Sequence, residues 1–173
     1  MNAYYETITN SLGDVAAVVD ENGRLLRVVF LHEGRRPGVV QSWEKTAEAL
    51  AKAGYELRQD GAKTAVAAAQ LRDYFAGRRR DFDLELAPLG TEFQRRIWDA
   101  LCAIPRGETR TYTDLARAAG RPRSARAAGR ACATNPLPIV VPCHRAVGRD
   151  GSLTGFAGGI GMKRALLELE GSL

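Results

Sequence analysis

The chain has 173 residues, and 25 Lys and Arg against 20 Asp and Glu give it a net charge of +5. Hydrophobic residues make up 45% and charged residues 26%, a globular mixture that argues against a disordered chain. No apolar run approaches the roughly 20 residues of a membrane span, and the first residues do not open a signal peptide. We therefore expect a cytoplasmic protein, and an odd number of cysteines suits that reducing compartment: Cys102, Cys132 and Cys143.

The positive charge belongs to the second half of the chain. Residues 1–88 carry 12 basic and 13 acidic side chains, whereas residues 89–173 carry 13 basic and 7 acidic ones. The excess is explained either by a solvated positive face or by a surface that binds a polyanion such as nucleic acid.

The first half predicts strands followed by helices. Asp20-Glu21-Asn22-Gly23 lies between two apolar runs, which predicts a hairpin. The predicted strands cover residues 4–9, 14–19, 24–30 and 83–86, and the predicted helices cover residues 43–53 and 64–75. No pairing of titratable residues in this half suggests catalytic chemistry.

Pro88-Leu89-Gly90 marks the expected boundary between two domains, residues 1–88 and 89–173. Thr91 and Gln94 have the spacing of a capping box, which predicts that a helix begins there. Two short helices follow, one over residues 111–119 and one from Pro122 or Ser124 to Ala133. Such a pair is typical of a helix-turn-helix, although short helical pairs are also common in structural roles.

The second of these short helices carries very small side chains apart from Arg126 and Arg130. Small residues allow either tight packing against a neighbouring helix or close approach to a nucleic-acid groove. Further arginines flank the pair and favour the second interpretation: Arg110, Arg117, Arg121 and Arg123.

A buried apolar run, residues 139–141, delivers Cys143 and His144 just after a proline. A thiolate is a strong nucleophile, and a histidine can take the proton of the thiol. Adjacent residues of an extended chain point to opposite faces, so His144 should reach the sulfur only through a bend or a bridging water. From these two residues alone, a half-buried cysteine beside a structural histidine is an equally open interpretation. A metal site is not expected, because the chain has only two histidines and no Cys-x-x-Cys spacing.

The surroundings of Cys143 carry a specific resemblance. Asn135-Pro136-Leu137-Pro138-Ile139 followed by Pro142-Cys143-His144-Arg145 resembles the active-site signature of the O6-alkylguanine-DNA alkyltransferases, also called methylated-DNA–protein-cysteine methyltransferases. The resemblance covers residues 91–171, whereas residues 1–88 fit the family only by length and strand order. The other matching elements are Phe93-Gln94 to Trp98, Ile104 to Glu108, Thr111-Tyr112, Gly155 to Gly159, and Leu166-Leu167 to Glu170-Gly171.

This resemblance implies an α/β fold. A small ribonuclease H-like sheet domain with helices, residues 1–88, would precede a mostly helical, winged-helix-like helix-turn-helix domain, residues 89–173. By the same resemblance Cys143 is the nucleophile, His144 its base through a water, and Glu170 the carboxylate that orients His144. Asn135 would brace the turn before the cysteine, and Tyr112 would assist nucleotide rotation and proton transfer.

The resemblance also implies a partner, double-stranded DNA, bound through its minor groove by a monomer without a cofactor or a metal. Arg126 would enter the base stack in place of the rotated nucleotide. The implied DNA-binding residues are Tyr112, Ala125, Arg126, Ala127 and Arg130, and the implied pocket residues are Pro138, Ala146, Phe156 and Ala157.

The implied function is direct, irreversible and stoichiometric removal of the alkyl group from O6-alkylguanine, and also from O4-alkylthymine, onto Cys143. Three positions depart from the commonest family pattern and bear on pocket size: Thr134 replaces glycine, Ala146 replaces valine and Ala157 replaces serine. The alternatives are a non-catalytic module that binds or signals DNA damage and a thiol hydrolase. The damage-binding alternative is represented by related proteins that lack the cysteine, which this chain has. The thiol hydrolase fits worse because no oxyanion-donor motif is recognisable.

Overall fold

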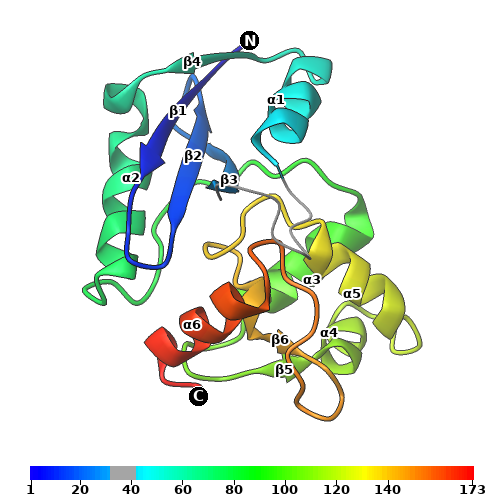
Figure 1. The fold of residues 1–173 in the computed structure, drawn as a ribbon. Coiled ribbons are helices and arrows are strands. Elements are labelled where there is room, and N and C mark those ends of the chain that lie inside the picture. The colour runs from blue at the N-terminus through cyan, green and yellow to red at the C-terminus, as the bar shows by residue number, and fades with distance from the viewer. Residues whose placement is uncertain (32–41) are drawn as a thin grey trace. The chain divides into compact units, whose positions relative to one another are not determined.

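The computed structural model describes residues 1–31 and 42–173, so His32 lies outside the described residues. The described residues divide into two compact units, one ending at Leu89 and the other beginning at Gly90 (Figure 1). None of the described helices is long and apolar enough to cross a membrane.

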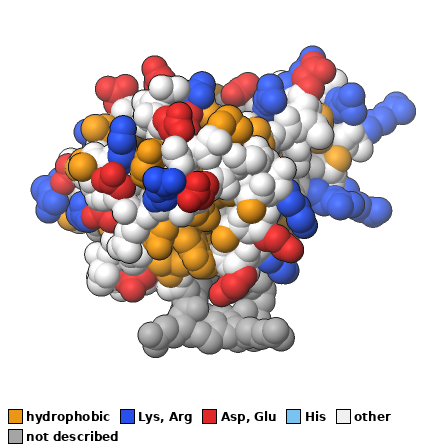
Figure 2. Space-filling view, turned by 90° about the horizontal axis from the view of Figure 1, so that it is seen from above, with side chains coloured by type: hydrophobic (Ala, Val, Ile, Leu, Met, Phe, Trp, Pro, Cys, Tyr) orange, Lys and Arg blue, Asp and Glu red, His pale blue; other side chains and the backbone are white. Residues whose placement is uncertain are grey.

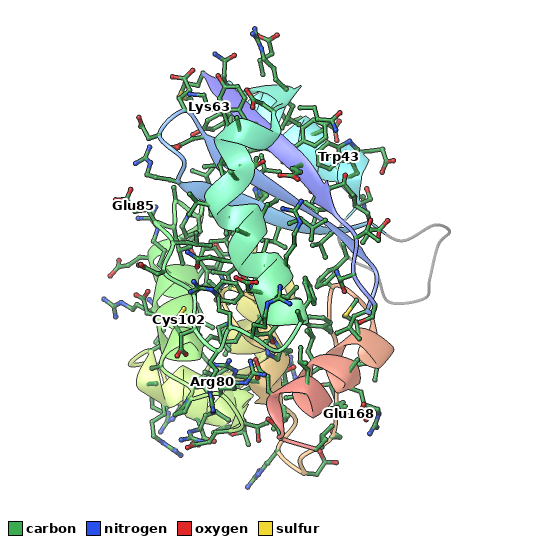
Figure 3. All side chains as sticks on the ribbon, turned by 90° about the vertical axis from the view of Figure 1, so that its left-hand side faces the viewer. Trp43, Lys63, Arg80, Glu85, Cys102 and Glu168 are labelled. Atoms are coloured by element: carbon green, nitrogen blue, oxygen red, sulfur yellow. The ribbon has the colours of Figure 1, made fainter. Side chains whose placement is uncertain are left out.

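The first unit is built on a four-stranded sheet with the order β3-β2-β1-β4. Strands β1, β2 and β3 run antiparallel, and β4 runs parallel to β1, with Asn2 opposite Glu56. Two helices, α1 and α2, lie on opposite sides of this sheet (Figure 1), and Figure 3 views the sheet from the side of α2, which carries Lys63. The bounds are β1 Asn2–Ile8, β2 Asp14–Asp20, β3 Leu25–Leu31, α1 Trp43–Lys52, β4 Glu56–Gln59 and α2 Gly61–Phe75.

The predicted hairpin between β2 and β3 is present and has a local cause. The Asp20 carboxylate accepts from the backbone N–H groups of Asn22 and Arg24, and Gly23 has a φ of +79°. An aspartate that bonds the backbone two residues on and a glycine with positive φ are what a tight turn requires.

The structure of this unit differs from the sequence predictions at three places. Strand β4 was not predicted, because three of its four residues are polar and exposed and only Leu57 is apolar. The expected strand at residues 83–86 forms only an isolated bridge, between Leu86 and Leu25, within the described part of the chain. Helix α2 also begins earlier than expected, because Asp60 caps it by accepting from Ala62 and Lys63.

The second unit is mostly helical. The predicted capping box is confirmed at the start of α3, and a second one joins Thr111 to Asp114 at the start of α4. The indole of Trp98 donates to the carbonyl of Ala131 at 3.0 Å and so ties α3 to α5. A small sheet before a helical unit confirms the predicted α/β class. The bounds are α3 Glu92–Cys102, β5 Arg110–Thr111, α4 Tyr112–Ala118, α5 Ala125–Ala133, η1 Cys143–Arg145, β6 Ala146–Val147 and α6 Ile160–Glu170.

Candidate active site

The turn that leads to Cys143 is held by a buried asparagine. The side-chain amide of Asn135 donates to the carbonyl of Val141 at 2.8 Å, and its carbonyl oxygen accepts from Leu137 N–H at 2.9 Å. Within this turn Ile139 has a φ of +77°, a region that a β-branched residue adopts at a cost of about 1–3 kcal/mol. Asn135 therefore stabilises a backbone path that these residues would not follow by themselves.

Removing this side chain should destabilise the protein. We expect Asn135→Ala to lower the free energy of unfolding by about 2–4 kcal/mol, because two buried backbone groups lose their partners. Urea unfolding measures the change. Asn10→Ala is a matched control: Asn10 makes the same pair of bonds, with Gly13 and Leu12, in a partly exposed turn where water can replace it. Equal losses in the two variants would contradict a special role for the buried turn.

Cys143 and His144 lie in a short 3-10 helix, η1, and not in the extended segment that the apolar run suggested. Proline precedes this helix, and the bonded turn of residues 137–141 replaces a strand ladder, so the run ends in a bend. Cys143 is only 5% exposed, and burial raises the pKa of its thiol to about 11. A hydrogen bond from Asn135 and the positive charge of Lys163 act in the opposite direction. The resting sulfur is therefore a thiol, which needs a base before it can attack.

His144 is completely buried, and one of its nitrogens faces a carboxylate. Its Nε2 lies 3.0 Å from Oε1 of Glu170 on α6. Burial lowers the pKa of His144 more than Glu170 raises it, so the ring is neutral at pH 7. Among the residues that the structure describes, neither ring nitrogen makes a well-aligned hydrogen bond, so Nε2 meets Glu170 as a close charged contact and Nδ1 faces no polar partner. A neutral ring oriented at Nε2 and open at Nδ1 has the form of a general base.

The half-buried Tyr112, at the start of α4, closes another side of the site. Its hydroxyl donates to the carbonyl of Thr154 at 3.2 Å, and burial raises its pKa. Its ring lies beside Gly129 of α5, where an added Cβ would come within 3.9 Å. All four residues expected in the substrate pocket are buried, and the Phe156 ring meets the His144 ring edge to face with centroids 6.4 Å apart. These residues are Pro138, Ala146, Phe156 and Ala157.

Helix α5 has one buried and one exposed face. Ala128, Ala131 and Cys132 are buried, whereas Arg126, Ala127 and Arg130 are exposed and Ala125 is half-buried. The small residues thus allow close packing on the buried face. On the exposed face they leave only short side chains, from which Arg126 and Arg130 protrude. Lys and Arg side chains gather at the right-hand edge of Figure 2.

Comparison with known proteins decides the family. The model of the 6-O-methylguanine DNA methyltransferase DNA-binding domain matches residues 92–172. A methylated-DNA–protein-cysteine methyltransferase of Methanosarcina barkeri is 41% identical over 96% of this chain and 96% of its own length. The chain belongs to the methylated-DNA–protein-cysteine methyltransferase family. The resemblance noted in the sequence is confirmed.

Solved structures of the family agree in fold as well as in sequence. The O6-methylguanine methyltransferase of Mycobacterium tuberculosis is 40% identical, with a TM-score of 0.79 over 98% of this chain and 93% of that one. The same organism's protein in complex with DNA gives a TM-score of 0.80 at 38% identity, over 99% of this chain and 94% of that one. In that structure the Mycobacterium tuberculosis protein is bound to DNA.

Two buried cations of this methyltransferase were given no role from the sequence. Arg145 makes a two-pronged ion pair with Glu170, and Lys163 donates to the carbonyls of Ala146 and Thr154. Burial lowers the pKa of Lys163, whose side chain lies beside Cys143. Each had a signal in the sequence: Arg145 follows His144 directly, and Lys163 lies two turns before Glu170, on the face of α6 that also carries Leu166 and Leu167.

The described residues contain no group of three or more His, Cys, Asp and Glu side chains that could hold a metal ion. The ionisable groups at the core of the site are the Cys143 thiol, the His144 imidazole, the Glu170 carboxylate and two cations, Arg145 and Lys163.

Proposed function

We propose that this protein repairs alkylated DNA directly, by transferring the alkyl group from O6 of guanine to Sγ of its own Cys143. The observation that carries the proposal is the series of buried side chains that leads from the Cys143 thiol through His144 to Glu170. The buried thiol is followed by a histidine with an open Nδ1, and that histidine is oriented at Nε2 by Glu170. This is the arrangement of an activated nucleophile.

The step balances without any further reactant. A water between the two groups passes the thiol proton to Nδ1 of His144 as Sγ attacks the alkyl carbon. The new S–C bond takes its electron pair from the sulfur, and the pair of the broken C–O6 bond goes to guanine. Guanine then takes a proton from the Tyr112 hydroxyl in this proposal, and the proton held by His144 replaces it through water. The product thioether is neither a good leaving group nor readily hydrolysed, so each molecule acts once.

The lesion must leave the base stack before the sulfur can reach it, because a stacked O6 is inaccessible to a buried thiol. We propose that α5 binds the minor groove and that Arg126 fills the space of the rotated nucleotide. The low exposed face of α5 supports this close approach. The same pocket would accept O4-alkylthymine, whose reactive carbon is bonded to an equivalent exocyclic oxygen.

A non-catalytic damage-binding module would need neither the cysteine nor its buried relay, and the relatives' names as methyltransferases favour transfer. We also propose a monomer in the cytoplasm, where reducing conditions keep the Cys143 thiol available.

Incubation of the protein with a duplex that contains O6-methylguanine tests the function. Digestion of the DNA should show one lesion restored to guanine per protein molecule and no further turnover, and an unchanged lesion content would refute the proposal.

The relay makes a separate prediction about pH. His144→Ala and Glu170→Ala should both slow the reaction at neutral pH and shift its greatest rate to higher pH, where the Cys143 thiolate forms, an alkaline rise that is separate from the titration of the His144–Glu170 pair. The proton acceptor or its orienting partner is lost, so more of the reaction depends on thiolate formed against a pKa of about 11. Single-turnover rates from pH 6 to pH 10 measure this shift. If both variants kept the profile of the native protein, the relay would be wrong.

A further inference from the structure

Glu170 serves two partners at once. Its Oε1 lies 3.0 Å from His144 Nε2 and accepts from Arg145 Nη2 at 2.9 Å, while its Oε2 accepts from Arg145 Nε at 2.8 Å. Arg145 also donates to the carbonyl of Ile104 from its third nitrogen. The guanidinium is therefore fixed at three points, and the carboxylate that it grips cannot rotate away from the imidazole.

The charges around His144 come from three elements. Glu170 and Lys163 face it from α6, and Cys143 and Arg145 are its neighbours in η1. On α3, Asp99 and Cys102 interact with each other, and Arg145 is the basic group that faces Cys102. Glu170 alone would favour an imidazolium, whereas Arg145 and Lys163 both disfavour it. All of these His144 neighbours are buried, and Lys163 completely so, and their charges are therefore little screened.

We propose that Arg145 is a positioning residue for the alkyl transfer: it holds Glu170 against His144 and offsets the carboxylate's charge at the imidazole. The inference deepens the proposed function and rests on it. Without Arg145, the buried Glu170 would face His144 as an unbalanced anion. The His144–Glu170 pair would then keep a proton up to a higher pH, whichever of the two groups carried it. A relay that already holds that proton cannot accept another from Cys143.

The sign of the effect separates Arg145 from Glu170. Below the pH at which the pair releases its proton, the transfer rate falls, which gives the profile an acid limb. Arg145→Met should move this limb upward by about one pH unit, so that the rate at a pH below the limb falls about tenfold. Glu170→Gln should move the limb downward, because the anion that favours the imidazolium is gone. Arg145→Lys keeps the positive charge but loses the two-pronged hydrogen bonding of the guanidinium to Glu170. The acid limb of this variant should therefore stay at the native pH, while its plateau rate falls.

The experiment uses the full chain and measures single-turnover transfer from a duplex containing O6-methylguanine, from pH 5 to pH 9. Arg106→Met is the matched control, because Arg106 donates to the carbonyl of Leu169, next to Glu170, and its loss should leave the acid limb in place. Each variant is first checked by its thermal unfolding midpoint. A limb that moves upward in Arg145→Met and not in Arg106→Met supports the inference.

A purely structural role would lower the rate by the same factor at every pH, and an unmoved limb in Arg145→Met would overturn the inference. If Arg145→Met does not fold, Arg145→Lys is the deciding variant. An acid limb that moves in Arg145→Lys, although the charge is kept, would overturn the inference. A plateau rate equal to that of the native protein would overturn it as well. Failure of the proposed function itself looks different: the native protein would then transfer no alkyl group at any pH.

Discussion

Cys143→Ala should abolish alkyl transfer and leave DNA binding almost unchanged. The variant removes the sulfur that we propose forms the new bond, whereas the proposed phosphate contacts come from exposed arginines. Transfer is measured from the lesion content of duplex DNA, and binding from the anisotropy of a labelled duplex. We expect no transfer above the uncatalysed level and a Kd within about threefold of the native value, a change below 1 kcal/mol.

Cys132→Ala is the matched control for this result. Cys132 is also buried, lies at the end of α5, and has a thiol pKa raised even further by burial. It has no histidine of its own in the described site, so its loss should leave transfer in place. Transfer that persisted in Cys143→Ala, with the alkyl group on Cys102 or Cys132, would contradict the assignment of the nucleophile.

Arg126→Ala should separate nucleotide rotation from chemistry. Extrusion of a base costs a few kcal/mol, and each 1.4 kcal/mol that is not recovered lowers the rotated population about tenfold. If Arg126 fills the vacated space, its loss should slow repair of duplex DNA by roughly ten- to a thousandfold. The reaction with free O6-benzylguanine, which needs no rotation, should keep its rate. Single-turnover rates on the two substrates give the comparison.

Arg130→Ala provides the control from the same helix, because Arg130 is also exposed and lies one turn further along α5. A phosphate contact of this kind should weaken binding modestly and reduce the salt dependence by about one unit of slope. If Arg126→Ala behaved in the same way, it too would be a phosphate contact. Equal slowing on duplex and free base would mean that the pocket had been damaged, and the rotation hypothesis would fail.

Local patterns in the sequence predicted most helices, because their causes are local. The capping box of Thr91 and Gln94 places the start of α3, and the small residues of α5 place that helix. The two-residue ladder between β5 and β6 could not be predicted, since Arg110 pairs with Ala146, far along the chain. Strand β4 is similar: its pairing with β1, and not its own polar residues, makes it a strand.

The site shows the same division. The motif around Cys143 predicted which side chains gather there, and the structure brings Asn135, His144 and Glu170 together. It could not predict the path of the turn, because the positive φ of Ile139 is imposed by the hydrogen bonds of Asn135 and by burial. Nor could it show that Glu170 is shared, since the bond to Arg145 depends on how α6 packs against η1.

The most direct test of the account is the intact mass of the protein after reaction with duplex DNA containing O6-methylguanine, followed by peptide mapping. We expect a single increase in mass, equal to one methyl group in place of one hydrogen, located on the peptide that contains Cys143. We also expect the fraction of modified protein to equal the fraction of lesions repaired. An unmodified protein beside repaired DNA, or a methyl group on any other residue, would contradict the account.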